Sequence, residues 1–321
     1  MDTSSTPLVA RDALSTPATV GVAVGCTVGA LLVMAFAVFT HKALNFRTLN
    51  NGVNANFHWK HEIVLITGGA GGIGGETVKY LAQKGTKIVV LDIIPMTYPA
   101  PPNVYYYKCD LTKYENVLEV AEKIRLQVGN PTVIIANAGI CRGQPILHAA
   151  KRDISLTFEV NTLGLLWTIK TFLPSLVANN HGHLLIVASQ TAFITSAGVT
   201  DYCASKAAAL SIYEGVHSEM KHIYNAPAVR VSCISPSHVK TGMFTGIKSV
   251  PGMTSLTPES IAKTIGDILY SGFAHNIMIP KSAYASKLAR IMPEWFRITA
   301  QDIAAGAFKT LTPHDPMAKS Q

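Results

Sequence analysis

The stretch "LITGGAGGIGGE", residues 65–76, decides the fold. It continues an apolar run and precedes a segment with helical periodicity, so its glycines lie at an expected strand-to-helix turn. Thr67, Gly68, Gly72 and Gly74 fit the pattern TGxxxGxG. Glycines there allow a tight turn and let backbone amides approach a pyrophosphate, which the positive end of a helix also favours. The stretch predicts a phosphate-binding turn, although a glycine-rich turn is a weak signal on its own.

Short apolar runs alternate with helical stretches along the chain after this turn. The expected strands cover residues 62–67, 87–92, 104–110, 132–137, 183–189 and 229–235, and the expected helices cover residues 74–85, 113–128, 153–177, 202–224 and a stretch that begins at 257. The strands are nearly continuous apolar runs, which is typical of parallel strands covered on both faces. The alternation predicts an α/β fold, a doubly wound, Rossmann-like parallel sheet in a single domain.

Composition limits the class of protein. The chain has 321 residues, of which 48% are hydrophobic and 14% charged, and its net charge is +8. The length suits one large domain with appendages. The basic residues are scattered and form no run with interleaved aromatic residues, so we expect no nucleic-acid partner and a mild preference for anionic membrane surfaces.

Cysteine and histidine spacing argues against disulfides and metal ions. The five cysteines are irregularly spaced and form no CxxC motif, which indicates a reducing compartment. The pairs His58 with His61 and His181 with His183 lack a convincing third ligand. We therefore expect exposed loop histidines and no metal site.

The N-terminal region carries a long uncharged segment. No Asp, Glu, Lys or Arg occurs from residue 13 to residue 41, and its centre, Ala18 to Phe39, is 22 residues long. As a helix this centre reaches roughly 33 Å, enough to cross a hydrocarbon core of about 30 Å. A cleaved signal peptide and a buried core helix are the alternative interpretations. More basic residues follow the segment than precede it, which places the bulk of the chain in the cytosol.

These features divide the chain into five parts: an N-terminal tail (1–12), a transmembrane anchor (13–41), a connector (42–60), a domain that contains the phosphate-binding turn (61–280) and a C-terminal tail (281–321). The connector aromatics Phe46, Phe57 and Trp59 are expected at the membrane interface or packed on the domain. In the C-terminal tail, Tyr284, Leu288 and Ile291 share one face of an expected helix. That face is either core packing or a membrane-surface helix that feeds a lipid substrate into the site.

The pattern Tyr-x-x-x-Lys occurs twice, and its surroundings distinguish the two cases. Tyr80 and Lys84 follow the glycine turn without an upstream serine at a strand end, and we interpret them as a surface pair. Tyr202 follows Ser189 by 13 residues and precedes Lys206 by four. Residues four apart share a helix face, so the Lys206 cation is expected to lower the pKa of the tyrosine. The resulting phenolate can remove the proton of a substrate alcohol, and Ser189 can hydrogen-bond the substrate oxygen.

An acidic residue at the end of the second strand bears on the choice of cofactor. Asp92 lies 24 residues after Gly68, where a carboxylate can accept hydrogen bonds from ribose hydroxyls. Its charge would repel a 2′-phosphate, and residues 67–75 contain no Lys or Arg that would attract one. NAD is therefore favoured over NADP.

Taken together, three motifs resemble the short-chain dehydrogenase/reductase family: TGxxxGxG, "NAG" at residues 137–139 and YxxxK on a late helix. The resemblance covers roughly residues 61–245. It implies a catalytic set, each member of which has a match here: Asn161, Ser189, Tyr202 and Lys206. It also implies the following cofactor-binding residues: Thr67, Gly68, Gly72, Ile73, Gly74, Asp92, Asp110, Leu111, Asn137, Ala138, Gly139, Tyr202, Lys206 and Thr241.

Within this set the resemblance assigns Asp110 to the adenine, Thr241 to the nicotinamide carboxamide and Asn161 to a water next to Lys206. The segment "KTGMF", residues 240–244, and the N-terminal span resemble the membrane-anchored branch that acts on retinoids, steroids and related lipids. The chain departs from the family pattern where Ala136 precedes "NAG" and where Ser237 replaces a common glycine.

The sequence therefore predicts a membrane-anchored oxidoreductase that transfers hydride between a lipophilic alcohol or ketone and NAD. An NADP-dependent carbonyl reductase and a non-catalytic cofactor-binding protein of membranes or lipid droplets are the alternatives. From position, Thr191, Phe193 and Phe244 are expected to line the substrate cavity. The expected partners are a lipophilic small molecule, a membrane and a second copy in a homodimer, and the expected location is the endoplasmic reticulum or a lipid droplet.

Overall fold

A computed structural model describes residues 17–247, 254–308 and 310–311. The chain divides into two compact units between Thr48 and Leu49. Helix α1 (Pro17–Leu49) forms the described part of the first unit, and it continues past residue 42, where the sequence predicts an irregular connector. Across the described residues, no helix combines the length and the apolar composition required to cross a membrane.

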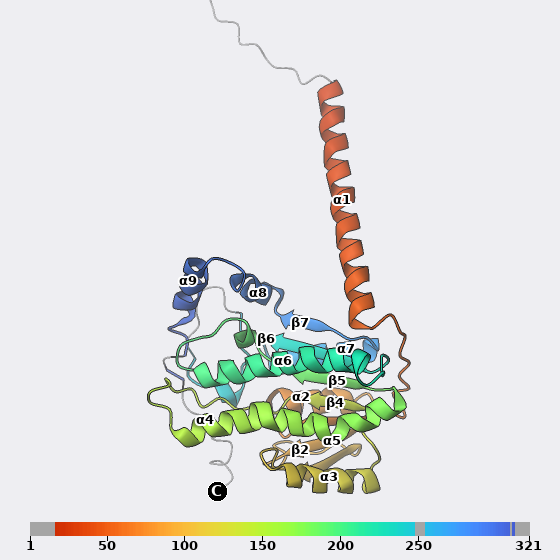
Figure 1. The fold of residues 1–321 in the computed structure, drawn as a ribbon, viewed down its shortest axis with the longest axis vertical. Coiled ribbons are helices and arrows are strands. Elements are labelled where there is room, and N and C mark those ends of the chain that lie inside the picture. Colours follow the sequence, from red (N-terminus) through yellow and green to blue (C-terminus); the bar gives the residue numbers. More distant parts are fainter. Residues whose placement is uncertain (1–16, 248–253, 309, 312–321) are drawn as a thin grey trace, which may run out of the picture. The chain divides into compact units, whose positions relative to one another are not determined.

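The second unit is built on one parallel sheet of seven strands (Figure 1). The order across the sheet is β3-β2-β1-β4-β5-β6-β7, so the chain starts in the middle and winds outward in both directions. The strands are β1 (Ile63–Thr67), β2 (Lys87–Asp92), β3 (Val104–Lys108), β4 (Val133–Ala136), β5 (His183–Val187), β6 (Arg230–Pro236) and β7 (Asn276–Ile279). This topology confirms the predicted doubly wound α/β fold.

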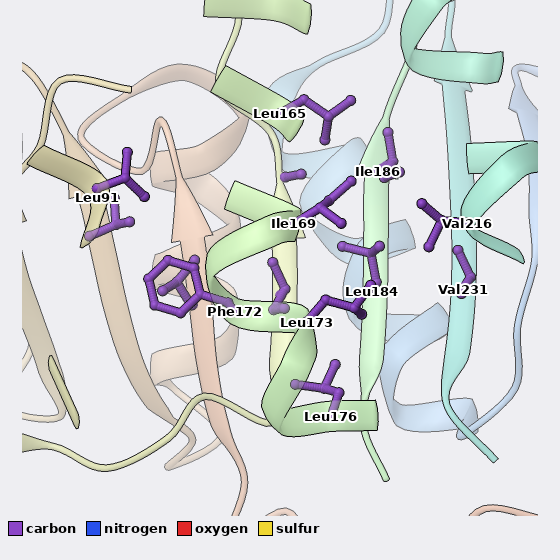
Figure 2. Close-up of a cluster of buried hydrophobic side chains, with 14 of the residues drawn as sticks. Leu91, Leu165, Ile169, Phe172, Leu173, Leu176, Leu184, Ile186, Val216 and Val231 are labelled. Atoms are coloured by element: carbon purple, nitrogen blue, oxygen red, sulfur yellow. The ribbon is translucent and has the colours of Figure 1, made fainter. Parts of the chain in front are cut away.

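Five long helices cover the two faces of the sheet. Apolar side chains of α3 (Tyr114–Gln127), α5 (Gly164–Asn179) and α6 (Thr200–His222) pack in one core with residues of β1, β2, β4, β5 and β6. Figure 2 shows part of this core, where Ile169 and Leu173 of α5 lie against Leu184 of β5. On the opposite face, α2 (Gly72–Ala82) and α7 (Pro258–Ser271) form a second core with alternate strand residues. Both faces are buried because successive strand residues point to opposite sides, which explains the continuous apolar runs.

The helix predicted over residues 153–177 is interrupted. Helix α4 (Lys151–Phe158) passes into a π-helical turn, Glu159–Leu163, before α5 begins. Asn161 lies in this turn, where its side chain bonds both backbone groups of Ile140 and the hydroxyl of Ser205. A π turn inserts a residue into a helix and is frequent at functional sites. The pattern of apolar residues does not reveal the π turn, because apolar residues continue in α5 directly after the turn.

The C-terminal segment also differs from the prediction. Tyr284 ends a 3₁₀ turn (Lys281–Tyr284), Leu288 lies in α8 (Ala285–Ala289), and Ile291 lies in the turn before α9 (Glu294–Ala304). The single helical face predicted for these three residues is therefore wrong. The helical structure is interrupted between α8 and α9, and Pro293 directly precedes α9. Proline has no backbone N–H, so it is tolerated at the start of a helix but not inside one.

Residues 50–59 belong to the second unit. Trp59 lies 4.4 Å from Tyr270, centroid to centroid, and 5.7 Å from Phe57. Phe57 and Trp59 pack against the core formed with α2 and α7, as one of the two interpretations predicts. Phe46, the third connector aromatic, lies in α1 and is exposed, so that interpretation is wrong for it. His183, expected in an exposed loop, is instead fully buried at the start of β5, where its Nε2 lies 2.8 Å from the hydroxyl of Ser232. That expectation is wrong because His183 already belongs to the strand.

Candidate active site

A cavity of about 1080 Å³ lies where the parallel strands end. Residues that follow β1, β2, β4, β5 and β6 contribute to its walls, among them Gly68, Asn137, Ser189 and Ser237. In doubly wound folds the crevice at the carboxyl ends of the strands is the usual ligand site. The cavity also extends to α8 and α9, and its lining there is apolar except for Ser286.

The glycine turn opens this cavity next to α2. Gly68 and Gly72 have φ angles of +67° and +56°, a conformation that side chains with a Cβ rarely adopt. A Cβ on Gly74 would lie 2.0 Å from the carbonyl oxygen of Gly68, so only glycine lets the helix approach the turn this closely. Gly71 precedes α2 without a side-chain cap, which leaves backbone N–H groups of the first turn for another acceptor. This turn therefore fits a phosphate group.

Two predicted residues brace the turn and do not line the cavity. The hydroxyl of Thr67 accepts hydrogen bonds from the backbone N–H groups of Asn137 and Ala138, each at 3.1 Å. The Asn137 amide donates back to the carbonyl oxygens of Thr67 and Gly68. Thr67 is buried and Gly74 is packed against the turn, and neither borders the cavity. Both residues shape the site from behind it.

Asp92 borders the cavity at the end of β2. Its carboxylate accepts backbone hydrogen bonds from Ala70 at 2.9 Å, Ile93 at 2.8 Å and Ile94 at 3.3 Å. Burial raises the pKa of this carboxyl, and the three hydrogen bonds oppose that rise. Two oxygens offer about four acceptor positions, so one remains for a ribose hydroxyl.

Thr97 and Tyr98 cover the glycine turn, and the sequence does not predict this contact. Thr97 donates its N–H and its hydroxyl to the carbonyl oxygen of Ala70, and the Tyr98 hydroxyl donates to that of Gly69. Thr97 also lines the cavity. These contacts join residues 27 and 29 positions apart, and no local pattern signals them.

The remaining predicted cofactor residues lie along the same wall. Those that border the cavity are Ile73, Asp110, Leu111, Asn137, Ala138, Gly139 and Thr241. The Asp110 carboxylate accepts the N–H and the hydroxyl of Thr112, which holds the loop after β3. Ser237, at the departure from the family pattern, donates its N–H to the carbonyl oxygen of Ile279 and does not have a positive φ. Serine is therefore accommodated there without strain.

Tyr202, Lys206 and Ser189 come together on the cavity wall. The hydroxyl of Ser189 accepts hydrogen bonds from the backbone N–H of Thr191 at 3.2 Å and from the Thr191 hydroxyl at 2.9 Å. The Lys206 amine donates to the carbonyl oxygen of Val187 at 3.0 Å and lies 5.9 Å from the centre of the Tyr202 ring.

Asn161 does not border the cavity, although it lies close behind the wall. A Cβ on Gly139 would lie 3.2 Å from the Lys206 amine and 3.3 Å from Oδ1 of Asn161. The two side chains therefore approach the same glycine.

Burial dominates the protonation of this group. The Tyr202 phenol lies among apolar residues, and burial raises its pKa above the ordinary value, while the hydrogen bond with Ser189 opposes the rise. Burial lowers the pKa of Lys206 from 10.5 to about 8. The expectation that Lys206 lowers the pKa of Tyr202 is not met here, because the loss of water around the phenol outweighs the hydrogen bond that favours ionisation.

The substrate-side expectations are met in part. Thr191 and Phe244 line the cavity, and the Phe244 ring meets that of Tyr202 edge-on at 5.7 Å. Phe193 does not line the cavity, and its ring lies 5.0 Å from the Lys287 amine instead. Gln190 and Ser286 also border the cavity and share a hydrogen bond of 2.6 Å, a contact across 96 positions that the sequence does not reveal.

The second Tyr-x-x-x-Lys pair lies outside the cavity. The Lys84 amine lies 5.4 Å from the centre of the Tyr80 ring, and that ring packs tightly against Gly266 of α7. Tyr80 is half-buried, so the pair belongs to helix packing more than to the open surface.

Comparison with known proteins identifies the family. The model of the short chain dehydrogenase family matches residues 62–251 of this chain. This chain belongs to the short-chain dehydrogenase family. Its members are oxidoreductases that use a nicotinamide cofactor, and the chain is accordingly an NAD(P)-dependent enzyme of the class that acts on CH–OH groups.

Similar members of the family include retinol and hydroxysteroid dehydrogenases. Human "Epidermal retinol dehydrogenase 2" is 35% identical over 206 residues, which are 61% of this chain and 66% of that protein. Human "Estradiol 17-beta-dehydrogenase 11" is 31% identical over 244 residues, which are 73% of this chain and 80% of that protein. A solved short chain dehydrogenase from Burkholderia cenocepacia J2315, in complex with NADP, has a TM-score of 0.66 at 22% identity and covers 76% of this chain and 99% of its own. That structure shares the fold.

Proposed function

We propose that this protein is a membrane-anchored dehydrogenase that transfers hydride between a lipophilic alcohol or ketone and NAD, with Tyr202 as its acid/base group. The observation that carries the proposal is that Ser189, Tyr202 and Lys206 line the same cavity, with the Lys206 amine 5.9 Å from the centre of the buried Tyr202 ring. When bound, the nicotinamide supplies the hydride acceptor or donor. The chain's own residues bind the substrate oxygen and move its proton.

Tyr202 is the group that exchanges a proton with the substrate. Its raised pKa keeps the phenol protonated near neutral pH, so it can donate to the oxygen of a ketone. In the alcohol direction it accepts the alcohol proton. Lys206, with a pKa of about 8, is mostly cationic at neutral pH. Its charge acts toward the phenolate that this direction needs, against the larger effect of burial on Tyr202. Ser189 contacts the same phenol and can bond the substrate oxygen as its charge changes.

Asn161 holds Ile140 in place beside Lys206. It bonds both backbone groups of Ile140, which itself lines the cavity. We assign it the family's role of holding a water next to Lys206, because both side chains approach Gly139. Thr67 and Gly74 act indirectly, by fixing the glycine turn.

Residues along the wall would hold the cofactor in an extended arrangement. The turn at Gly68, Gly72 and Ile73 suits the pyrophosphate, and Asp92 suits the ribose hydroxyls of the adenosine half. Asp110 and Leu111 line the adenine side. Lys206 would also bond the second ribose, and Thr241 would bond the carboxamide. Gly139 has no Cβ that would crowd the Lys206 amine, so the cofactor can approach the backbone closely at this position.

The preference for NAD rests on charge. A carboxylate, Asp92, lies at the ribose site. Among the described residues that line the cavity, the basic ones are Arg142, Lys206 and His238, and burial lowers the pKa of His238. Arg142 lies 3.3 Å from Asp153, and Lys206 donates to Val187, so neither is next to the turn. The related Burkholderia structure contains NADP, which keeps an NADP-dependent carbonyl reductase as the second candidate.

The substrate class follows from the cavity and the relatives. Its lining includes Phe244, Met243 and Ile247 together with residues of α8 and α9. Such a lining suits a largely apolar molecule with one reacting oxygen near Tyr202. The names of the similar proteins, retinol and estradiol dehydrogenases, support a retinoid, steroid or long-chain alcohol.

The membrane anchor is carried by the sequence of residues 13–41, which contain no acidic or basic residue except histidine. We place the catalytic unit in the cytosol, on the endoplasmic reticulum or a lipid droplet, and a homodimer belongs to the same proposal. Protease treatment of sealed microsomes tests the topology. Residues 49–321 should be digested without detergent, and protection until detergent is added would contradict it.

Activity is tested with purified full-length protein in detergent. Retinol, sterols, hydroxysteroids and long-chain alcohols are offered in turn with NAD or NADP, and formation of the reduced cofactor is followed. Turnover of at least one lipophilic alcohol with NAD is expected. Turnover with NADP alone would favour the carbonyl reductase, and no turnover with either cofactor in either direction would contradict the proposal.

A further inference from the structure

The C-terminal segment exposes a group of large apolar side chains. We call it the C-terminal apolar patch, and its members are Tyr284, Leu288, Ile291, Met292, Trp295, Phe296, Ile298 and Ile303. Ile291 is 79% exposed, Trp295 69% and Ile298 47%. Single exposed apolar residues are ordinary, but a contiguous stretch of them marks an interaction surface.

The patch borders the active-site cavity. Leu288, Met292 and Phe296 are exposed and at the same time line the cavity. A side chain that does both must lie at the rim. Ile291, Trp295 and Ile298 do not line the cavity. They therefore form the outer part of the patch, beside the opening and away from the reacting groups.

Polar contacts fix the patch against the catalytic loop. The Arg290 guanidinium donates to the carbonyl oxygen of Phe193 at 2.8 Å, and Gln190 donates to the Ser286 hydroxyl at 2.6 Å. In each bond one residue, Phe193 or Gln190, lies within four positions of Ser189. The other residue lies in α8 or directly after it. The patch is thus a built rim of the cavity and has a defined orientation toward it.

The charge around the patch indicates the kind of partner. Residues 281–304 contain four basic side chains, Lys281, Lys287, Arg290 and Arg297, and two acidic ones. The whole chain carries a net charge of +8. Apolar and aromatic side chains interspersed with basic ones suit the interface of a bilayer that contains anionic lipids.

We propose that the C-terminal apolar patch docks on an anionic bilayer and that substrate enters the cavity directly from the lipid. Docking buries the outer part of the patch among the acyl chains and headgroups. The rim residues then face lipid, so a lipophilic alcohol reaches Tyr202 without crossing water. The docking stands on the exposed residues alone, whereas the entry of an alcohol rests on the proposed function.

Docking is tested by fluorescence of the full-length protein in vesicles of phosphatidylcholine and phosphatidylserine with brominated acyl chains. The chain has three tryptophans, and Trp295 is the one in the patch. Bromine should quench a part of the emission that is missing in Trp295→Phe and retained in Trp167→Phe, which removes a half-buried residue of α5. Equal quenching in Trp295→Phe and the wild-type protein overturns the docking. Shielding of Trp295 by a second copy, seen as crosslinked dimers without bromine quenching, also overturns it.

Substrate entry is tested with the double variant Ile291→Glu/Ile298→Glu. For a long-chain alcohol dissolved in the vesicles, KM should rise about tenfold with kcat unchanged, since two charges oppose insertion. A short, water-soluble alcohol should show no change. Leu126→Glu, at an exposed apolar residue of α3, is the matched control and should leave both KM values unchanged.

The two proposals fail in distinguishable ways. Equal losses for both alcohols in the double variant, or the same KM change in Leu126→Glu, overturn substrate entry from the lipid. If the wild-type protein oxidises no alcohol at all, the proposed function fails, and entry of an alcohol fails with it. The quenching result then still decides docking by itself.

Discussion

Replacement of Arg230 by methionine should destabilise the second unit strongly. Arg230 is fully buried in β6, and its guanidinium donates to the carbonyl oxygens of Gly272 at 3.3 Å and Asn50 at 3.1 Å, as well as to those of Val53 and Pro227. Among the described residues it has no acidic partner within ion-pair distance. Methionine keeps most of the apolar stem, so the change chiefly removes the donors.

The magnitude follows from these contacts. A hydrogen bond to a charged donor contributes about 1.5–3 kcal/mol, and each carbonyl left buried without a partner costs about 1–3 kcal/mol. Removal of the guanidinium also relieves its own desolvation, which is several kcal/mol for a buried ion. The net loss in the free energy of unfolding should be about 3–5 kcal/mol, because several hydrogen bonds to the charged donor are lost and the relieved desolvation offsets only part of that loss.

Urea unfolding of the full-length protein in detergent, followed by tryptophan fluorescence, measures this loss. Arg125→Met is the matched control, because that side chain is 38% exposed and pairs only with Glu122 of the same helix. The control should change stability by less than about 0.5 kcal/mol. The reasoning is refuted if Arg230→Met unfolds at the same urea concentration as Arg125→Met.

Three further predictions concern protonation, backbone space and cofactor choice. Burial lowers the pKa of His183 from 6.5 to about 3, so the unfolded chain binds a proton that the folded chain excludes between these values. The free energy of unfolding should therefore fall by up to about 1.4 kcal/mol per unit as pH drops from 6.5 towards 3, and His183→Gln should flatten this slope whereas His148→Gln should not. A Cβ at position 74 would lie 2.0 Å from backbone, whereas one at position 215 meets nothing within 4 Å, so thermal unfolding should show Gly74→Ala destabilised and Gly215→Ala stabilised by about 0.5–1 kcal/mol. Asp92→Ala should lower the ratio of the NADP dissociation constant to the NAD dissociation constant, measured by titration of each cofactor. An unchanged ratio would show that Asp92 is not the basis of the cofactor preference.

The sequence predicts the central part of the fold because its physical signals are local. Buried parallel strands are short apolar runs, and six of them stand out between turns. The sequence does not predict β7, because β7 is a four-residue edge strand whose pairing with β6 depends on the completed sheet. The π turn at Asn161 escapes for a different reason: it inserts residues without disturbing the apolar periodicity on either side.

The site divides in the same way. Residues within motifs, such as Gly68, Asp92 and Tyr202, line the cavity as the spacing predicts. The cover by Thr97 and the bond between Gln190 and Ser286 depend on contacts between distant segments, which no local pattern records.

Protonation is less accessible still. Spacing places Lys206 on the same helix face as Tyr202, and from this alone one expects a lowered tyrosine pKa. The structure adds the apolar enclosure of the phenol, which reverses the direction. Charge effects in a site therefore require the burial of each group as well as its neighbours.

The most direct test compares Tyr202→Phe with Tyr80→Phe, since both tyrosines stand four residues before a lysine and only Tyr202 borders the cavity. Turnover of the best lipophilic alcohol and the NAD dissociation constant are measured for each folded variant. Loss of the acid/base group in Tyr202→Phe should lower kcat by about 10²–10⁴-fold while the NAD dissociation constant changes little. Tyr80→Phe should leave kcat and the NAD dissociation constant unchanged. Full turnover in Tyr202→Phe, or loss of turnover in folded Tyr80→Phe alone, would contradict the assignment of the active site.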